Sequence, residues 1–152
     1  MESFITNQND LFVYFEVIKQ LSPSSVLDVG MLLKRAGAVS RQVADSKLDS
    51  HVYLTGIDLL SEYRLPIYDR IYDRIISQAE FPDVAELQYD LVILLGFSSI
   101  PSFFSLEYLK EHTNWILTSY HIKNALLSCF SAKNAREIQL EDDKYLLIRT
   151  KS

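Results

Sequence analysis

The chain has 152 residues and a mass of 17.5 kDa, which fits one domain and excludes a separate cofactor domain joined to a substrate domain. Its 48% hydrophobic residues exclude a disordered chain, because disorder requires too little apolar surface to offset conformational entropy. The 15 basic and 20 acidic residues give a formal charge of -5, and no basic run is present, so a nucleic-acid surface is not expected.

The N-terminal segment predicts a cytoplasmic protein. Residues 1–10 lack the basic start and apolar run of a signal peptide, and no segment approaches the roughly 20 apolar residues that span a bilayer. The single cysteine, Cys129, excludes an internal disulfide and a cysteine-rich zinc site. We therefore expect one domain over residues 1–152, with an N-terminal helix and linker over 1–24 and a core over 25–150.

The first half of the chain alternates between helical and strand patterns. Apolar residues at helical spacing predict a helix over residues 11–20, and a short apolar run between Pro and Gly predicts a buried strand over 25–29. A second helical pattern covers 31–48, and a β-branched, apolar run predicts a strand over 51–60. This alternation favours a parallel sheet with right-handed crossovers.

The middle of the chain contains the sequence Ile-Tyr-Asp-Arg twice. These two copies predict a helix over residues 67–75 behind Pro66, with a strand at its end over 74–78. The uninterrupted apolar run at 89–96 is the strongest strand signal and predicts a strand in the middle of the sheet.

The last third continues the alternation and then changes it. We expect a helix over residues 101–111, a strand over 115–120 and a helix over 122–130. Two final runs, at 136–140 and 144–150, flank an acidic turn and predict an antiparallel hairpin.

Acidic residues and glycines stand at the ends of these strands. The strand at 25–29 contains Asp28 and is followed by Gly30, the strand at 51–60 contains Asp58 and Leu59, and a later strand begins Tyr-Asp-Leu-Val. This order of elements and motifs resembles the class I S-adenosylmethionine-dependent methyltransferases over roughly residues 25–150. The resemblance implies an α/β fold with a doubly wound, Rossmann-like sheet of about seven strands, mostly parallel with a C-terminal antiparallel hairpin.

The resemblance also implies a site at the carboxyl ends of the strands. An acid after the second strand would bind the ribose hydroxyls of S-adenosylmethionine, and an apolar neighbour would contact adenine. The cofactor-binding residues implied in this way are Asp28, Gly30, Asp58, Leu59, Gln78, Ala79 and Gly96. The substrate-binding residues expected at the tips of later strands are Ser98, Ser99, Tyr120 and His121.

The glycine-rich turn of that family is only partly present. Its later glycine positions fall on Leu32 and Lys34, whose side chains would occupy space beside the methionyl group unless the loop takes another path. Two functions therefore stay open. One is a methyltransferase with an unknown acceptor, and the other is a non-catalytic module that binds a protein, a nucleotide or a second copy of itself.

The candidate residues also have purely structural interpretations. Asp28 would accept hydrogen bonds from backbone N–H groups of adjacent loops, and Asp58 would cap a helix. His121 would be a surface or helix-capping histidine, since no acid or nucleophile stands beside it in the sequence. The three histidines have no metal-ligand spacing, so no metal site is predicted.

Overall fold

The computed structural model describes residues 8–33, 52–59, 66–78, 88–95, 97, 99–101, 113–128, 135–140 and 144–149. The helices predicted over 31–48 and 101–111 lie outside these residues, except for 31–33 and Pro101. Three of the proposed site residues, Ala79, Gly96 and Ser98, also lie outside them. None of the helices in the described ranges is long and apolar enough to cross a membrane.

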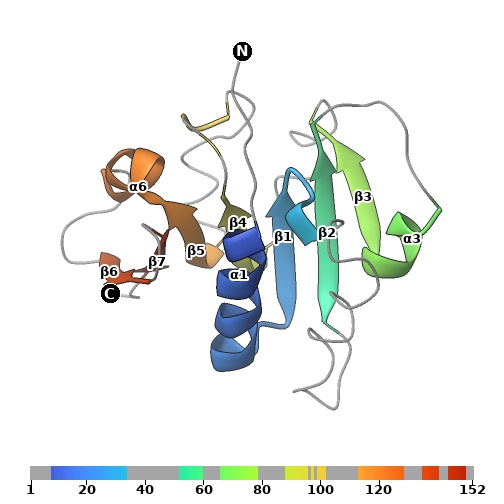
Figure 1. The fold of residues 1–152 in the computed structure, drawn as a ribbon, viewed down its shortest axis with the longest axis horizontal. Helices are drawn as coiled ribbons and strands as arrows, with labels where there is room; N and C mark the ends of the chain where they lie inside the picture. Colours follow the sequence, from blue (N-terminus) through green and yellow to red (C-terminus); the bar gives the residue numbers. More distant parts are fainter. Residues whose placement is uncertain are drawn as a thin grey trace.

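The described elements alternate in type along the chain (Figure 1). They are α1 (Gln8–Leu21), β1 (Ser25–Val29), β2 (Tyr53–Asp58), α3 (Tyr68–Ile71), β3 (Arg74–Ser77), β4 (Tyr89–Leu94), β5 (Thr113–Ser119), α6 (Tyr120–Leu127), β6 (Ala135–Gln139) and β7 (Lys144–Arg149). The predicted order of helix and then strand within residues 67–78 is confirmed.

The strands form one sheet in the order β3-β2-β1-β4-β5-β7-β6. The five strands from β3 to β5 are parallel, whereas β7 runs antiparallel to both β5 and β6. The expected α/β fold with a mostly parallel sheet is confirmed. Strand order reverses between β1 and β4, and in open α/β sheets ligands bind outside the carboxyl ends of the strands at such a point.

Two hydrophobic clusters cover the two faces of the sheet. Helix α1 packs on one face, and its buried residues Val13, Tyr14, Val17 and Ile18 join Leu54, Leu91 and Leu117 of the strands. Helix α6 contributes Ile122 and Leu126 to the opposite face, with Leu27, Ile57, Val92 and Ile116. Figure 1 shows α1 across the centre of the sheet and the arrowheads of β1, β2 and β3 at its upper edge.

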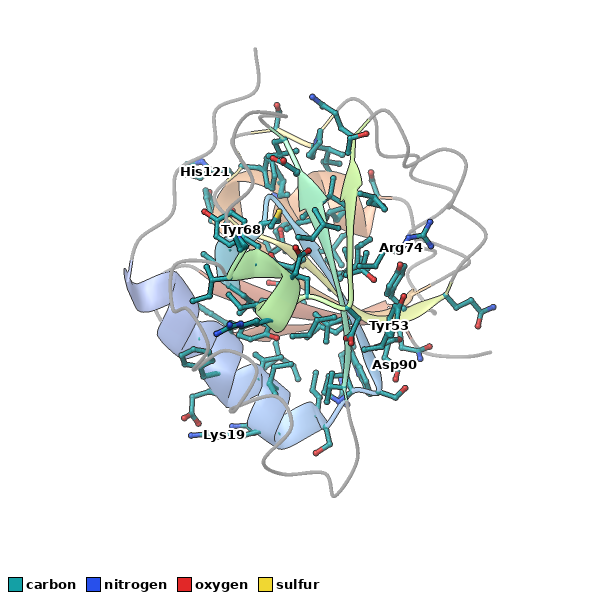
Figure 2. The ribbon with its side chains drawn as sticks, turned by 90° about the vertical axis from the view of Figure 1, so that its right-hand side faces the viewer. Lys19, Tyr53, Tyr68, Arg74, Asp90 and His121 are labelled. Carbon is teal, nitrogen blue, oxygen red and sulfur yellow. The ribbon has the colours of Figure 1, made fainter. Side chains whose placement is uncertain are left out.

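Asp90 ties three strands together at the amino ends of the sheet. Its Oδ2 accepts hydrogen bonds from the Ser24 N–H at 2.9 Å and the Ser24 hydroxyl at 2.6 Å, and its Oδ1 accepts one from Asn114 Nδ2 at 3.3 Å. Figure 2 shows Asp90 in the lower part of the molecule and His121 in the upper part. This acid therefore serves the fold at the edge opposite the candidate site.

Candidate functional site

The strand register brings three of the predicted residues to one edge of the sheet. Val29 of β1 pairs with Ile57 of β2, and the Gly30 N–H donates to the Ile57 carbonyl at 3.0 Å. On the other side of β2, Asp58 pairs with Ser77 of β3, so that Gln78 follows at the same edge. Gly30, Asp58 and Gln78 thus come from three adjacent strands, although they are far apart in sequence.

Asp28 lies deeper than this edge, and its carboxylate faces the chain that follows β1. The side chain is fully buried, with 0% exposure. Its Oδ1 accepts the Leu32 N–H at 3.0 Å, and its Oδ2 accepts the Leu33 N–H at 3.0 Å and the Tyr72 hydroxyl at 2.6 Å. Such hydrogen bonds to an ionised acceptor are about twice as strong as neutral ones, so Asp28 fixes the position of the loop.

We call residues 30–33 the β1 loop, and its path differs from that expected of a glycine-rich turn. Gly30 and Met31 both have positive φ, at 89° and 56°, so the chain reverses directly after the strand. Met31, Leu32 and Leu33 are all buried and pack into the hydrophobic cluster beneath α1. The bulk of Leu32 therefore points into the core, while Lys34 lies outside the described residues.

A left-handed backbone at Met31 is strained, because a Cβ atom in this region costs about 1 kcal/mol or more. Burial of the Met31 side chain, which is 2% exposed, offsets that cost. Its Cγ would lie 2.8 Å from a Cβ atom added at Gly56, so the side chain fits only because β2 has a glycine there. The conformation of the β1 loop therefore depends on the glycine at position 56.

Asp58 and its neighbours are partly accessible, in contrast to Asp28. Asp58, Leu59 and Gln78 are each half-buried at the carboxyl ends of β2 and β3. The Gln78 side chain donates from Nε2 to the Leu59 carbonyl at 3.2 Å. This hydrogen bond uses the amide nitrogen, and the amide oxygen Oε1 can accept a hydrogen bond from another group. A carboxylate, an apolar side chain and an amide oxygen are therefore presented together.

The second group of predicted residues lies at the junction of β5 and α6. Tyr120 is 56% exposed, and the ring of the exposed His121 meets it edge-on with centroids 6.2 Å apart. Lys123 Nζ lies 5.8 Å from the centroid of the Tyr120 ring and forms an ion pair with Glu137 at 2.9 Å. This group therefore presents an aromatic and a basic side chain.

The two groups share an edge but are not adjacent. In the sheet order, β1 and β4 separate β2 from β5, which corresponds to roughly 14 Å at the usual strand spacing. Asp58 and His121 therefore do not form a catalytic pair. Ser99 is exposed in the segment after β4, the strand between the two groups.

The contact of Tyr72 was not predicted from the sequence. Tyr72 contacts Asp28 across 44 residues of sequence, and no local motif signals such a long-range pair. Gly56 was missed as well, although a glycine inside a strand often marks a close approach of other atoms.

No protein-family model and no curated protein sequence matches the chain. Similar solved structures do exist. A candidate caffeoyl-CoA O-methyltransferase from Staphylococcus aureus has a TM-score of 0.57 and 12% identity, over 98% of this chain and 86% of that one. Cofactor-bound Rv0187 from MTB has a TM-score of 0.53 and 12% identity, over 97% of this chain and 82% of that one.

A third similar structure is a candidate O-methyltransferase from Klebsiella pneumoniae, with a TM-score of 0.50 and 10% identity, over 97% of this chain and 82% of that one. At such low identities the likeness concerns the fold. The chain therefore has a class I methyltransferase-like fold, as the order of its elements and motifs predicted.

Proposed function

We propose that the protein binds S-adenosylmethionine at the carboxyl ends of β1, β2 and β3 and is a methyltransferase whose acceptor is unidentified. The observation that carries this proposal is the placement of Asp58, half-buried at the tip of β2 and level with Gly30 and Gln78 on the adjacent strands. The cofactor in the similar structure of Rv0187 supports it.

Each residue of this edge has a chemical task in the proposal. Asp58 accepts hydrogen bonds from the two ribose hydroxyls, because an ionised carboxylate offers two acceptor oxygens. Leu59 supplies apolar contact for adenine, and Gln78 Oε1 accepts a hydrogen bond from the adenine amino group. Asp28, which is fully buried, acts through the β1 loop and does not touch the ligand.

The cofactor supplies an electrophilic methyl group on a sulfonium. In the transfer, a lone pair of the acceptor forms a bond to the methyl carbon while the carbon–sulfur bond breaks, leaving S-adenosylhomocysteine. The protein contributes mainly orientation to such an in-line displacement. We propose that Ser99, Tyr120 and His121, at the ends of β4 and β5, form the acceptor side. Ser98, also expected there, and Gly96, expected at the cofactor, lie outside the described residues.

A second candidate function is a non-catalytic module of the same fold, which binds a nucleoside or a partner protein. One observation favours it. The Leu32 and Leu33 N–H groups both donate to Asp28, so these two donors are occupied and do not hold the charged end of a methionyl group. Such a module would bind the adenosine part as tightly as the whole cofactor.

Calorimetric titration tests both candidates. We expect micromolar binding of S-adenosylmethionine and S-adenosylhomocysteine, and binding of adenosine at least about tenfold weaker if the methionyl part is held. Equal affinities for adenosine and the cofactor would favour the non-catalytic module. Absence of binding at millimolar concentrations would contradict the proposed function.

Asp58→Ala locates the site in the same titration. We expect affinity for S-adenosylmethionine to fall about tenfold, because a charged acceptor for two hydroxyls is lost. Asp69→Ala removes an exposed acid of α3 and is the matched control, with unchanged affinity expected. Unchanged affinity of Asp58→Ala would exclude Asp58 from the binding site.

A further inference from the structure

Tyr72 lies at the turn between α3 and β3, and its side chain extends to Asp28 of β1. Its side chain is 3% exposed, and its hydroxyl donates to Asp28 Oδ2 at 2.6 Å. This distance is at the short end for a hydroxyl bonded to a carboxylate, which indicates a strong charge-assisted hydrogen bond. It connects the end of α3 directly to the acid that holds the β1 loop.

The backbone of Tyr72 is anchored on both sides. Its N–H donates to the Tyr68 carbonyl at 2.9 Å. The next residue, Asp73, donates its N–H to the Leu54 carbonyl and accepts the Leu54 N–H at Oδ2, each at 2.8 Å. The phenol therefore extends from a backbone that is fixed to β2.

The ring of Tyr72 packs against β2 at a point that has no side chain. A Cβ atom added at Gly56 would lie 3.0 Å from Tyr72 Cε1 and 2.8 Å from Met31 Cγ. Gly56 thus leaves room for Tyr72 and for the β1 loop side by side. The ring is positioned by packing, and its hydroxyl donates one of the hydrogen bonds that hold the Asp28 carboxylate.

Asp28 Oδ2 is shared between the Tyr72 hydroxyl and the Leu33 N–H, while Oδ1 accepts the Leu32 N–H. If the hydroxyl is removed, a buried carboxylate loses a strong donor. We expect the two loop amides that bond the same carboxylate to be held less firmly. Because Gly30 and Met31 hold left-handed conformations, the β1 loop depends on such external bonds to keep its shape.

We propose that Tyr72 is a positioning residue of the cofactor site: through Asp28 it holds the β1 loop in the conformation that receives S-adenosylmethionine. The inference rests on the proposed function, because it concerns binding at that same edge. Tyr72 itself is buried and acts through Asp28. Gly30, the residue of this loop that lies beside Asp58, transmits the effect to the ligand.

Tyr72→Phe is the direct test, since it removes the hydroxyl and keeps the ring on Gly56. Amide hydrogen exchange of the ligand-free protein and titration with S-adenosylmethionine are measured together. We expect exchange at Leu32 and Leu33 to accelerate at least about tenfold and affinity to fall about fivefold. Exchange at Val92 and Ile93, in the central strand β4, stays unchanged.

Tyr89→Phe is the matched control. Tyr89 is also buried, at 4% exposure, and its hydroxyl also bonds a side chain, Thr55 Oγ1 at 3.2 Å, but it belongs to the cluster on the opposite face of the sheet. It should change neither the exchange of the β1 loop nor the affinity. An equal effect of both variants would mean general destabilisation and would overturn the proposal.

The remaining outcomes are decisive as well. Unchanged exchange at Leu32 and Leu33 in Tyr72→Phe, or faster exchange with unchanged affinity, would overturn the positioning role while the proposed function stands. Faster exchange throughout β4 would reduce Tyr72 to a structural residue and would also overturn it. If the unsubstituted protein binds no cofactor, the proposed function fails first, and the positioning role fails with it.

Discussion

Two acids on adjacent parallel strands have opposite surroundings. Asp28 of β1 pairs with Gly56 of β2, so Asp58 lies two residues, or roughly 7 Å, closer to the carboxyl edge. Asp28 is fully buried and bonded to two loop amides and a phenol, whereas Asp58 is half-buried at the tip. Depth along the strand therefore separates a buried acid that holds the β1 loop from a partly accessible acid, for which we propose contact with a ligand.

Asp28→Ala should have the largest effect. It leaves the Leu32 and Leu33 N–H groups and the Tyr72 hydroxyl without their buried acceptor, and each such loss costs about 1–3 kcal/mol. We expect the free energy of unfolding to fall by about 3–4 kcal/mol, measured by urea denaturation. Asp58→Ala in the same assay should lower it clearly less, because Asp58 is only half-buried. Similar losses of unfolding free energy in both variants would contradict the different roles assigned to Asp28 and Asp58.

Leu32→Ala tests whether the β1 loop turns its bulk inward. The Leu32 side chain is 1% exposed in the cluster beneath α1, so its truncation should lower the free energy of unfolding by about 2–4 kcal/mol. Affinity for S-adenosylmethionine, measured by calorimetry on the folded variant, should not rise. A gain in affinity would mean that Leu32 obstructs the methionyl group, as a glycine-rich turn in its usual place would suggest.

Much of the fold followed from local signals. The strand at 25–29 was predicted with the observed bounds of β1, because Pro23 and Gly30 flank a short apolar run. The strand expected over 51–60 is shorter in the structure, where β2 covers Tyr53–Asp58. Apolar composition identifies a strand well, but the hydrogen bonds that end it depend on its neighbours.

The candidate site was less predictable, for physical reasons. The edge residues Gly30 and Asp58 could be found, because residues after parallel strands meet at one edge. The path of the β1 loop could not, since it depends on a left-handed Met31 whose side chain fits against Gly56. The contact between Tyr72 and Asp28 also escaped prediction, because it is a tertiary contact with no periodic pattern. The ligand roles of these residues stay predictions.

The buried Tyr89 phenol should make the free energy of unfolding depend on pH, and this is the smallest of the expected effects. Burial raises the pKa of Tyr89 above its ordinary value of 10.0, although the hydrogen bond to Thr55 lowers it in part. The unfolded chain therefore releases the phenol proton first as the pH rises. The stabilisation from the neutral phenol is complete below pH 10.0 and is lost as the pH rises through the raised native pKa.

Tyr89→Phe removes this titration. Between about pH 8 and about pH 11, the unsubstituted protein should lose more unfolding free energy than the variant, as measured by urea denaturation at each pH. The difference between the two proteins cancels the titration of the other tyrosines. Equal losses would mean that the Tyr89 phenol ionises as readily in the folded protein as in the unfolded chain, and that burial at this end of β4 does not disfavour the charged form.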